Sequence, residues 1–309
     1  MKLRDFIQQP PFPDEERIYT LQNKYFYLRA GIDLAQHKQV PTGQQMLFVG
    51  SADVSLDALV QNNVRGLAPA FQAVGQAQGI YSIIMGKSDF EIDDAFMAML
   101  PPNVVLIAGC SVNTTDPRAL YLPMGCDFRS RTEAQSIKPR TPEERDILCY
   151  ANFSVNTHPS RPPLAERLVE APDILCEHMG AFMKYSLSRA DFFDRLSRSK
   201  FAISPRGNGI ESFRMWDCLY LGVIPVVKRE AVFMGELEDL PVLLIDDWDE
   251  FLGQSPDDWH ALYDQFLDRQ FNWEKLKLSF WMKRIYDQQF DRFTEFAKTM
   301  NMESPSHAQ

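Results

Sequence analysis

Short runs of consecutive apolar residues recur along the chain and alternate with stretches in which apolar residues have helical spacing. The continuous runs are residues 45–49, 79–85, 104–109, 120–125, 147–153, 201–203, 223–227 and 241–245. Runs of this length predict strands that are buried on both faces of a parallel sheet, with helices between them. Strands that alternate with helices indicate an α/β fold.

The length of 309 residues suggests about two domains of roughly 150 residues each. A hydrophilic, proline-containing segment, residues 129–145, separates two groups of predicted strands and is interpreted as a linker. The expected division is a first domain over residues 1–128, which opens with a polar lead-in and a helix near residues 15–35, and a second over residues 146–256. Residues 257–309 predict C-terminal helices with an aromatic stripe.

Composition narrows the classes of function. The chain is 45% hydrophobic and 24% charged, which is enough for two packed cores. Its net charge of −10 argues against a nucleic-acid surface. Any anionic ligand would have to bind at local arginines. Five scattered cysteines without a C-x-x-C pair are typical of reduced thiols. Without an apolar leader or a long apolar run, the expected location is cytoplasmic, with peripheral membrane contact as an option.

Candidate chemistry concentrates in residues 200–227, KFAISPRGNGIESFRMWDCLYLGVIPVV. The pattern predicts a strand, a turn, a helix from Ile210 to Leu221 and a second strand. Gly207 and Gly209 can take positive φ in the turn. Because the turn joins a strand's carboxyl end to a helix N-terminus, free N–H groups and the helix dipole favour an anion there.

Charged residues flank this turn. Glu211, Arg214 and Cys218 would share one helix face at spacings i, i+3 and i+7. Arg206 and Arg214 together suit a diphosphate, and Glu211 suits a sugar or ribose hydroxyl. An ordinary ion pair between Glu211 and Arg214 within the helix explains the spacing equally well.

The order and spacing of these residues resemble the C-terminal motif of the exostosin-like glycosyltransferases and, more distantly, the GT-B fucosyltransferases. The matching positions are Lys200-Phe201, Arg206-Gly207-Asn208-Gly209, Glu211, Arg214, Trp216-Asp217 and residues 219–227, within a likeness that covers about residues 186–249. The resemblance implies a GT-B fold, in which two Rossmann-like domains with parallel sheets face each other. It also implies that the C-terminal helices cross back to the first domain.

The same resemblance implies an activity: transfer of a sugar from a nucleotide-sugar donor, UDP- or GDP-linked, to a glycan or other hydroxyl acceptor, as in polysaccharide biosynthesis, without a metal or cofactor. Many retaining GT-B enzymes carry two glutamates at a fixed spacing around this helix. Here Asp217 would pair with Gly209, and Glu211 with Leu219, so neither pair is acidic. This departure favours inverting chemistry.

The implied donor-binding residues come from two loops. The motif loop supplies Arg206, Gly207, Asn208, Gly209, Glu211, Ser212 and Arg214. The loop after the strand at residues 147–153 supplies Asn152, Ser154, Asn156 and Arg161, because ligands of open α/β sheets bind outside the carboxyl ends of the strands. A solvated loop is the alternative for this second group.

Inverting transfer also needs a general base for the acceptor hydroxyl. Asp53, directly after a predicted buried strand, is the first candidate, ahead of Asp89, Asp116 and His37. A helix-capping aspartate is the alternative for Asp53. The pair Asp247-x-Asp249 is similar to a manganese-binding pair of another glycosyltransferase fold, but Asp249 is expected to cap a helix near residue 250.

Three alternatives stay open. A catalytically inactive module would bind nucleotide sugar or glycan through the same residues. A dinucleotide-dependent oxidoreductase using Gly207-x-Gly209 is disfavoured, since Ser212 occupies the third glycine position and no acidic ribose-binding residue is evident at a strand end about 20 positions on. A membrane or partner surface built from Lys275, Lys277, Lys283 and Arg284 is the alternative for the C-terminal helices.

Overall fold

The computed structural model describes residues 1–9, 12–18, 44–49, 80–85, 89, 91–127, 131–177, 180 and 187–299. The chain divides into two compact units. Unit 1 comprises Met1–Tyr19 and Met124–Leu278, and unit 2 comprises Thr20–Pro123 and Ser279–Gln309. Each is described by itself.

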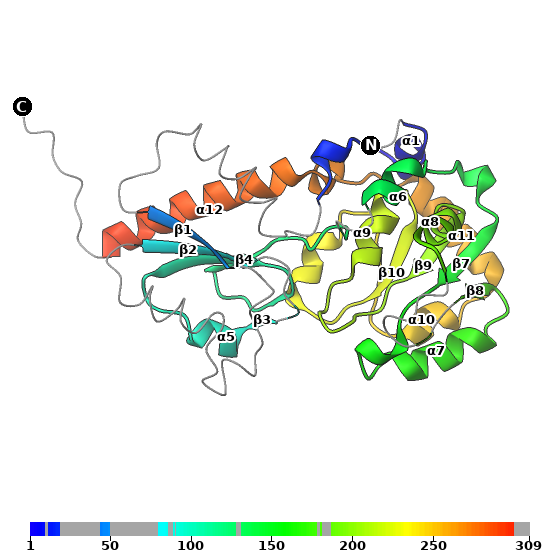
Figure 1. The fold of residues 1–309 in the computed structure, drawn as a ribbon, viewed down its shortest axis with the longest axis horizontal. Helices are drawn as coiled ribbons and strands as arrows, with labels where there is room; N and C mark the ends of the chain where they lie inside the picture. The colour runs from blue at the N-terminus through cyan, green and yellow to red at the C-terminus, as the bar shows by residue number, and fades with distance from the viewer. Residues whose placement is uncertain are drawn as a thin grey trace, which may run out of the picture. The chain divides into compact units, whose positions relative to one another are not determined.

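Unit 1 contains a five-stranded, fully parallel sheet. Its strands are β7 (Ile147–Ala151), β8 (Ile174–Cys176), β9 (Ser199–Ile203), β10 (Ile224–Lys228) and β11 (Leu243–Ile245). Their order across the sheet is β11-β10-β9-β7-β8 (Figure 1). The chain moves from β7 to one side and then returns to place β9 on the other side. The gap between β7 and β9 is therefore the topological switch point, where open α/β sheets bind ligands.

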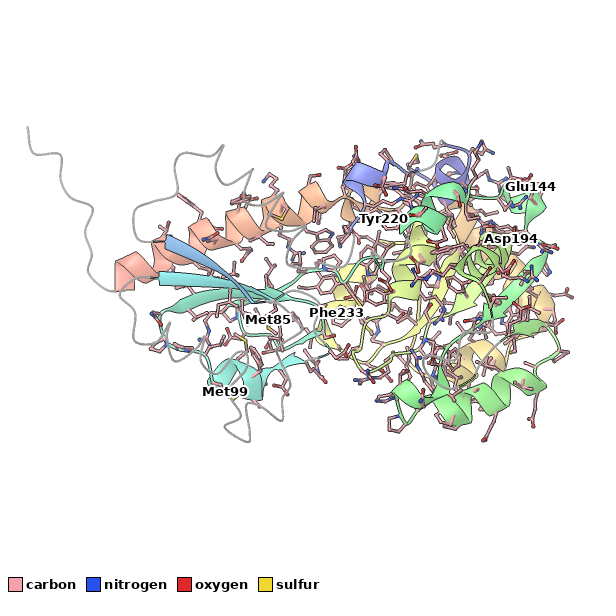
Figure 2. The ribbon with its side chains drawn as sticks, viewed as in Figure 1. Met85, Met99, Glu144, Asp194, Tyr220 and Phe233 are labelled. Atoms are coloured by element: carbon pink, nitrogen blue, oxygen red, sulfur yellow. The ribbon has the colours of Figure 1, made fainter. Side chains whose placement is uncertain are left out.

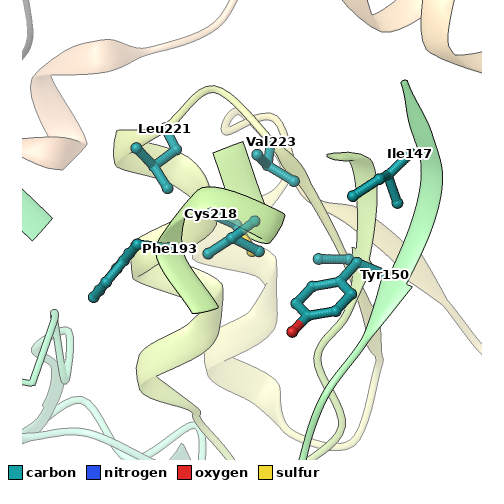
Figure 3. Close-up of a cluster of buried hydrophobic side chains, with 8 residues drawn as sticks. Ile147, Tyr150, Phe193, Cys218, Leu221 and Val223 are labelled. Atoms are coloured by element: carbon teal, nitrogen blue, oxygen red, sulfur yellow. The ribbon is translucent and has the colours of Figure 1, made fainter. Parts of the chain in front are cut away.

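Helices connect these strands, and their apolar faces form the core. From residue 131 onward, the helical elements of unit 1 are α6 (Arg131–Ser136), η4 (Pro142–Glu144), η5 (Val155–Thr157), α7 (Arg161–Glu170), α8 (Arg189–Ser197), α9 (Phe213–Tyr220), η6 (Val232–Leu237), α10 (Trp248–Leu252), α11 (Pro256–Asp268) and η7 (Trp273–Leu276). Figure 3 shows Phe193 of α8 and Cys218 of α9 in one buried cluster with Tyr150 of β7. This packing fixes α9 relative to the strand beside the switch point.

The segment interpreted as a linker is part of unit 1. Arg145 is only 3% exposed, and its guanidinium donates to the carbonyl oxygens of Ser199 (2.6 Å) and Leu221 (2.7 Å). The prediction of a linker over residues 129–145 was wrong because a charged residue there is buried against backbone carbonyls, which composition does not reveal.

The N-terminal residues also belong to unit 1 rather than to a first domain over residues 1–128. Helix α1 (Leu3–Ile7) buries Leu3, Phe6 and Ile7, and the Phe6 ring stacks on Trp273 at 3.8 Å between centroids. The Tyr220 hydroxyl accepts from the Ile18 N–H (2.8 Å) and donates to the Leu276 carbonyl (2.7 Å) (Figure 2). The described part of the helix expected near residues 15–35 is the short η1 (Asp14–Glu16), and residues 19–43 lie outside the described residues.

Unit 2 contains a four-stranded parallel sheet in the order β1-β2-β4-β6. These strands are β1 (Gln44–Val49), β2 (Ile80–Met85), β4 (Val104–Gly109) and β6 (Ala119–Tyr121). Two residue pairs, β3 (Ile92–Asp93) and β5 (Val112–Asn113), form a small second sheet beside α5 (Asp94–Ala98). Nearly all of α12 (Leu278–Thr299) belongs to this unit, where Trp281 packs edge-on against Tyr121. Parallel sheets in both units confirm the α/β prediction.

The turn that follows α9 requires a glycine at position 222. Gly222 has a φ of +64°, and a Cβ added there would lie 2.6 Å from Ile7 Cγ1. We expect Gly222→Ala to lower the free energy of unfolding by about 1 to 3 kcal/mol, through left-handed strain and the clash with α1. Urea denaturation measures this. Gly235→Ala is the matched control, because a Cβ at Gly235 meets nothing within 4 Å. If Gly222→Ala were as stable as Gly235→Ala, neither the positive φ at Gly222 nor its contact with Ile7 would limit the residue at that position.

Candidate functional site

The candidate site lies within unit 1, where loops follow the carboxyl ends of β7 and β9. The first loop runs over residues 152–160, and the second over residues 204–212. Because β7 and β9 are neighbours in the sheet, both loops emerge at the switch point.

Arg161, the first residue of α7, joins these two loops. Its side chain donates to three backbone carbonyl oxygens: Arg206 (2.6 Å), Ser154 (2.8 Å) and Pro205 (3.0 Å). The residue is 6% exposed. Arg161 is one of the predicted donor-binding residues, and the structure gives it a further role as the clamp that holds both loops.

Arg214, in the first turn of α9, brings a second guanidinium to the same place. It donates to the carbonyl oxygen of Asn152 in the first loop. Burial lowers the pKa of Arg214. Burial and, second, the charge of Arg214 lower the pKa of Arg161 to about 9. The charge of Arg214 thus acts on Arg161, and the two guanidinium groups place positive charge beside both loops.

Arg206 completes what we call the arginine cluster, Arg161, Arg206 and Arg214. Its Nε lies 3.8 Å from Glu230 Oε2, beyond hydrogen-bond distance. Three buried atoms around the cluster that can donate a hydrogen bond have no partner among the described residues: Arg206 Nε, Arg214 Nε and Ser212 Oγ. Ser212 stands at the N-cap of α9, but its side chain does not cap the helix. Unsatisfied polar atoms gathered at one place are suited to an incoming anion.

Glu211 does not take the position that the spacing suggested. Helix α9 begins at Phe213, three residues later than predicted, so Glu211 does not share a helix face with Arg214. Its carboxylate is 5% exposed and accepts from the Met124 N–H (3.0 Å) and from Trp216 Nε1. Glu211 therefore holds buried groups of unit 1 together, and its predicted role toward a sugar hydroxyl becomes a testable alternative.

The need for glycine at position 207 comes from close approach. Neither Gly207 nor Gly209 has a positive φ, which corrects the expected turn geometry. A Cβ there would lie 3.3 Å from Arg161 Nη2 and 3.7 Å from Thr157 Oγ1. The glycine thus lets the second loop pass close to Arg161 and to the first loop.

Other predicted donor residues take varied places. Asn152 and Ser154 contribute carbonyl oxygens to Arg214 and Arg161. Asn156, in η5, and Asn208 are exposed, and Gly209 is buried and accepts from the Gly207 N–H at 3.0 Å.

Two further residues lie at the arginine cluster. Glu230 is the first acidic residue after β10, about 20 positions after Gly209, which corrects the expectation that no acidic residue follows at a strand end there. His158 lies in the first loop, with Nδ1 2.8 Å from Ser160 Oγ. Burial, followed by the charges of Arg206 and Arg161, lowers the pKa of His158, so its imidazole is neutral at pH 7.

A buried acid lies one helical turn beyond Arg214. Asp217 is 7% exposed, and burial raises its pKa to about 7, partly opposed by a hydrogen bond from the Cys126 thiol and by the charge of Arg214. Asp217 therefore titrates near neutral pH and changes the charge close to the cluster.

The acidic pair near β11 has a capping role. Asp247 is the N-cap of α10 and accepts from the Asp249 N–H at 3.0 Å, which corrects the prediction that Asp249 is the cap. Asp249 pairs with Arg167. Among the residues that the structure describes, no group of three or more His, Cys, Asp or Glu side chains is arranged to hold a metal ion.

The candidate bases belong to unit 2. Asp53, the first choice, and His37 lie outside the described residues. Asp116 pairs with Arg118 at 2.7 Å, and hydrogen bonds from Arg118 hold the pKa of Asp116 below its ordinary value. A stabilised carboxylate is a poor proton acceptor, so Asp116 is disfavoured. Asp89 is exposed.

The lysines suggested for a membrane surface have ionic partners. Lys275 is 8% exposed and lies 2.7 Å from Asp239 Oδ1, and Lys277 lies 3.0 Å from Glu274 Oε1. Lys283 pairs with Asp287 one turn along α12. Within the described ranges, no helix has the length and apolar character needed to cross a bilayer.

An α1,3-fucosyltransferase crystal structure is similar over 76% of this chain and 84% of its own, with a TM-score of 0.40 and 11% sequence identity. No protein-family model and no curated protein matches the chain.

Proposed function

We propose that unit 1 binds a nucleotide sugar at the arginine cluster, and that the protein is an inverting, metal-independent glycosyltransferase acting on a glycan or other hydroxyl acceptor. The observation that supports this proposal is the arginine cluster: three arginines at a topological switch point, with buried polar atoms that lack partners among the described residues. A diphosphate supplies both the negative charge and the hydrogen-bond acceptors that this site needs. The motif in residues 200–227 supports the same proposal.

The proposed chemistry assigns separate tasks to the two units. In a direct displacement, negative charge develops on the leaving diphosphate, and Arg206, Arg214 and the N-terminus of α9 would stabilise it. The clamp made by Arg161 would keep these groups in position before the reaction, which lowers the cost of organising them. Asp53 remains the proposed base for the acceptor hydroxyl.

The first experiment is thermal-shift screening with UDP-, GDP-, CMP- and dTDP-sugars. A donor at 100 times its Kd should stabilise unit 1 by about 2.7 kcal/mol. We expect Arg214→Ala to lose this shift because the diphosphate loses a charged partner. Arg198→Ala is the control, since Arg198 precedes β9 at the amino end of the sheet and pairs with Asp146.

Two other outcomes carry information. No shift with any nucleotide sugar would refute the donor site, and a shift with a nicotinamide dinucleotide alone would favour the oxidoreductase reading. Donor binding without sugar transfer or donor hydrolysis would favour the catalytically inactive module, which shares the cluster but lacks a working base.

A further inference from the structure

We propose that His158 is a fourth phosphate-binding group of the arginine cluster, and that it takes up a proton when the diphosphate of a nucleotide sugar binds. This inference rests on the proposed function, because it concerns the same site. It adds a residue to the site and a proton to the binding reaction.

The backbone around His158 is tied to the cluster on both sides. The His158 carbonyl oxygen accepts from the Arg161 N–H at 3.1 Å. The neighbouring Thr157 hydroxyl is 3.7 Å from the position of a Cβ at Gly207, so this loop lies against the motif loop. Because Arg161 also holds the carbonyls of Ser154 and Arg206, the loop carrying His158 cannot move independently of the arginines.

Ser160 offers the His158 imidazole a hydrogen-bond partner in both protonation states. The Ser160 N–H donates to His158 Nδ1 at 3.3 Å, so the neutral ring carries its proton on Nε2. Ser160 Oγ lies 2.8 Å from the same Nδ1 and can accept a hydrogen bond when Nδ1 is protonated. On protonation, Nδ1 exchanges the hydrogen bond from the Ser160 N–H for one that it donates to Ser160 Oγ, and Nε2–H remains a donor for a phosphate oxygen.

The charges around His158 oppose protonation only while the site is empty of anion. Burial lowers the pKa of His158 most, and the charges of Arg206, in the loop after β9, and Arg161, at the start of α7, lower it further. A bound diphosphate reverses the sign of this local field, so the pKa of His158 is higher in the complex than in the free protein. Donor affinity is then greatest below the free-state pKa and declines as the pH rises through the bound-state pKa.

The test is calorimetry from pH 5.5 to pH 8 with the nucleotide sugar that gives a thermal shift. An intact nucleotide sugar is used because a terminal phosphate would itself titrate, with a second pKa of about 6. We expect binding to be about fivefold to tenfold tighter at pH 5.5 than at pH 8, with net proton uptake measured in buffers of different ionisation enthalpy.

Variants separate His158 from other sources of pH dependence. His158→Gln should bind with an affinity that is nearly independent of pH and takes up no proton. Ser160→Ala should reduce proton uptake, because the protonated ring loses its acceptor, whereas Ser160→Thr should retain it. His260→Gln is the control: His260 contacts Lys200 at 2.9 Å and should keep the full pH dependence.

Asp217 is the main competitor, since its ionisation with rising pH would also weaken binding by offsetting the charge of Arg214. The same pH slope in His158→Gln as in the wild type would assign the effect to Asp217 and overturn this inference. A pH-independent wild type would overturn it as well, while leaving the donor site in place. No binding at any pH would refute both the proposed function and this inference.

Discussion

Arg161→Met is expected to abolish measurable donor binding and to lower the free energy of unfolding by about 3 to 5 kcal/mol. The guanidinium is the shared donor for three carbonyl oxygens in two loops. Methionine retains the apolar stem but provides no N–H group, so these buried acceptors lose their partner. The loops would then separate, and the remaining arginines would lose their arrangement around the diphosphate.

Urea denaturation and calorimetry with the nucleotide sugar measure the two effects. Arg167→Met is the matched control on the same helix: its side chain is 44% exposed and pairs with Asp249. An exposed ion pair contributes about 0 to 1 kcal/mol, so this variant should be nearly as stable as the wild type and bind the donor normally. If Arg161→Met kept its stability and its donor affinity, the clamp would not be needed for the site.

The sequence predicted most of unit 1 because its strands are continuous apolar runs. Residues 201–203 and 223–227 correspond to β9 and β10. Because ligands bind outside the carboxyl ends of strands, the sequence also predicted that Arg161 and Arg214 belong to one site. The short strand β8 was missed, since its three residues give too brief a pattern.

The errors have a common physical origin in tertiary contacts. Arg145 belonged to a stretch that composition marked as a linker, yet backbone carbonyls distant in sequence bury it. Glu211 matched helical spacing, yet the helix begins after it. Gly207 was explained by φ, whereas the approach of Arg161 is what excludes a side chain. Local spacing in the sequence does not reveal such contacts. The identity of the general base also depends on tertiary contacts.

Substitution of Glu211 is expected to have the second large effect on stability. Its two possible roles, support of the fold and contact with the donor, predict different results for the alanine and glutamine variants. Glu211→Ala is expected to lower the free energy of unfolding by about 2 to 4 kcal/mol, since the buried N–H groups of Met124 and Trp216 lose their acceptor. Trp216 is fully buried, so bulk water does not reach its N–H in the wild type.

Glu211→Gln is the decisive partner variant. Both N–H groups donate to the same oxygen, Oε1, and a glutamine carbonyl oxygen can accept them in its place. We expect a loss of about 1 kcal/mol or less and a donor affinity within about twofold of the wild type. A ribose-binding carboxylate, as the family resemblance implies, would instead lose about tenfold in affinity, because a charged hydrogen bond becomes a neutral one. Denaturation and calorimetry on the same two variants therefore decide whether Glu211 supports the fold around the arginine cluster or contacts the donor itself.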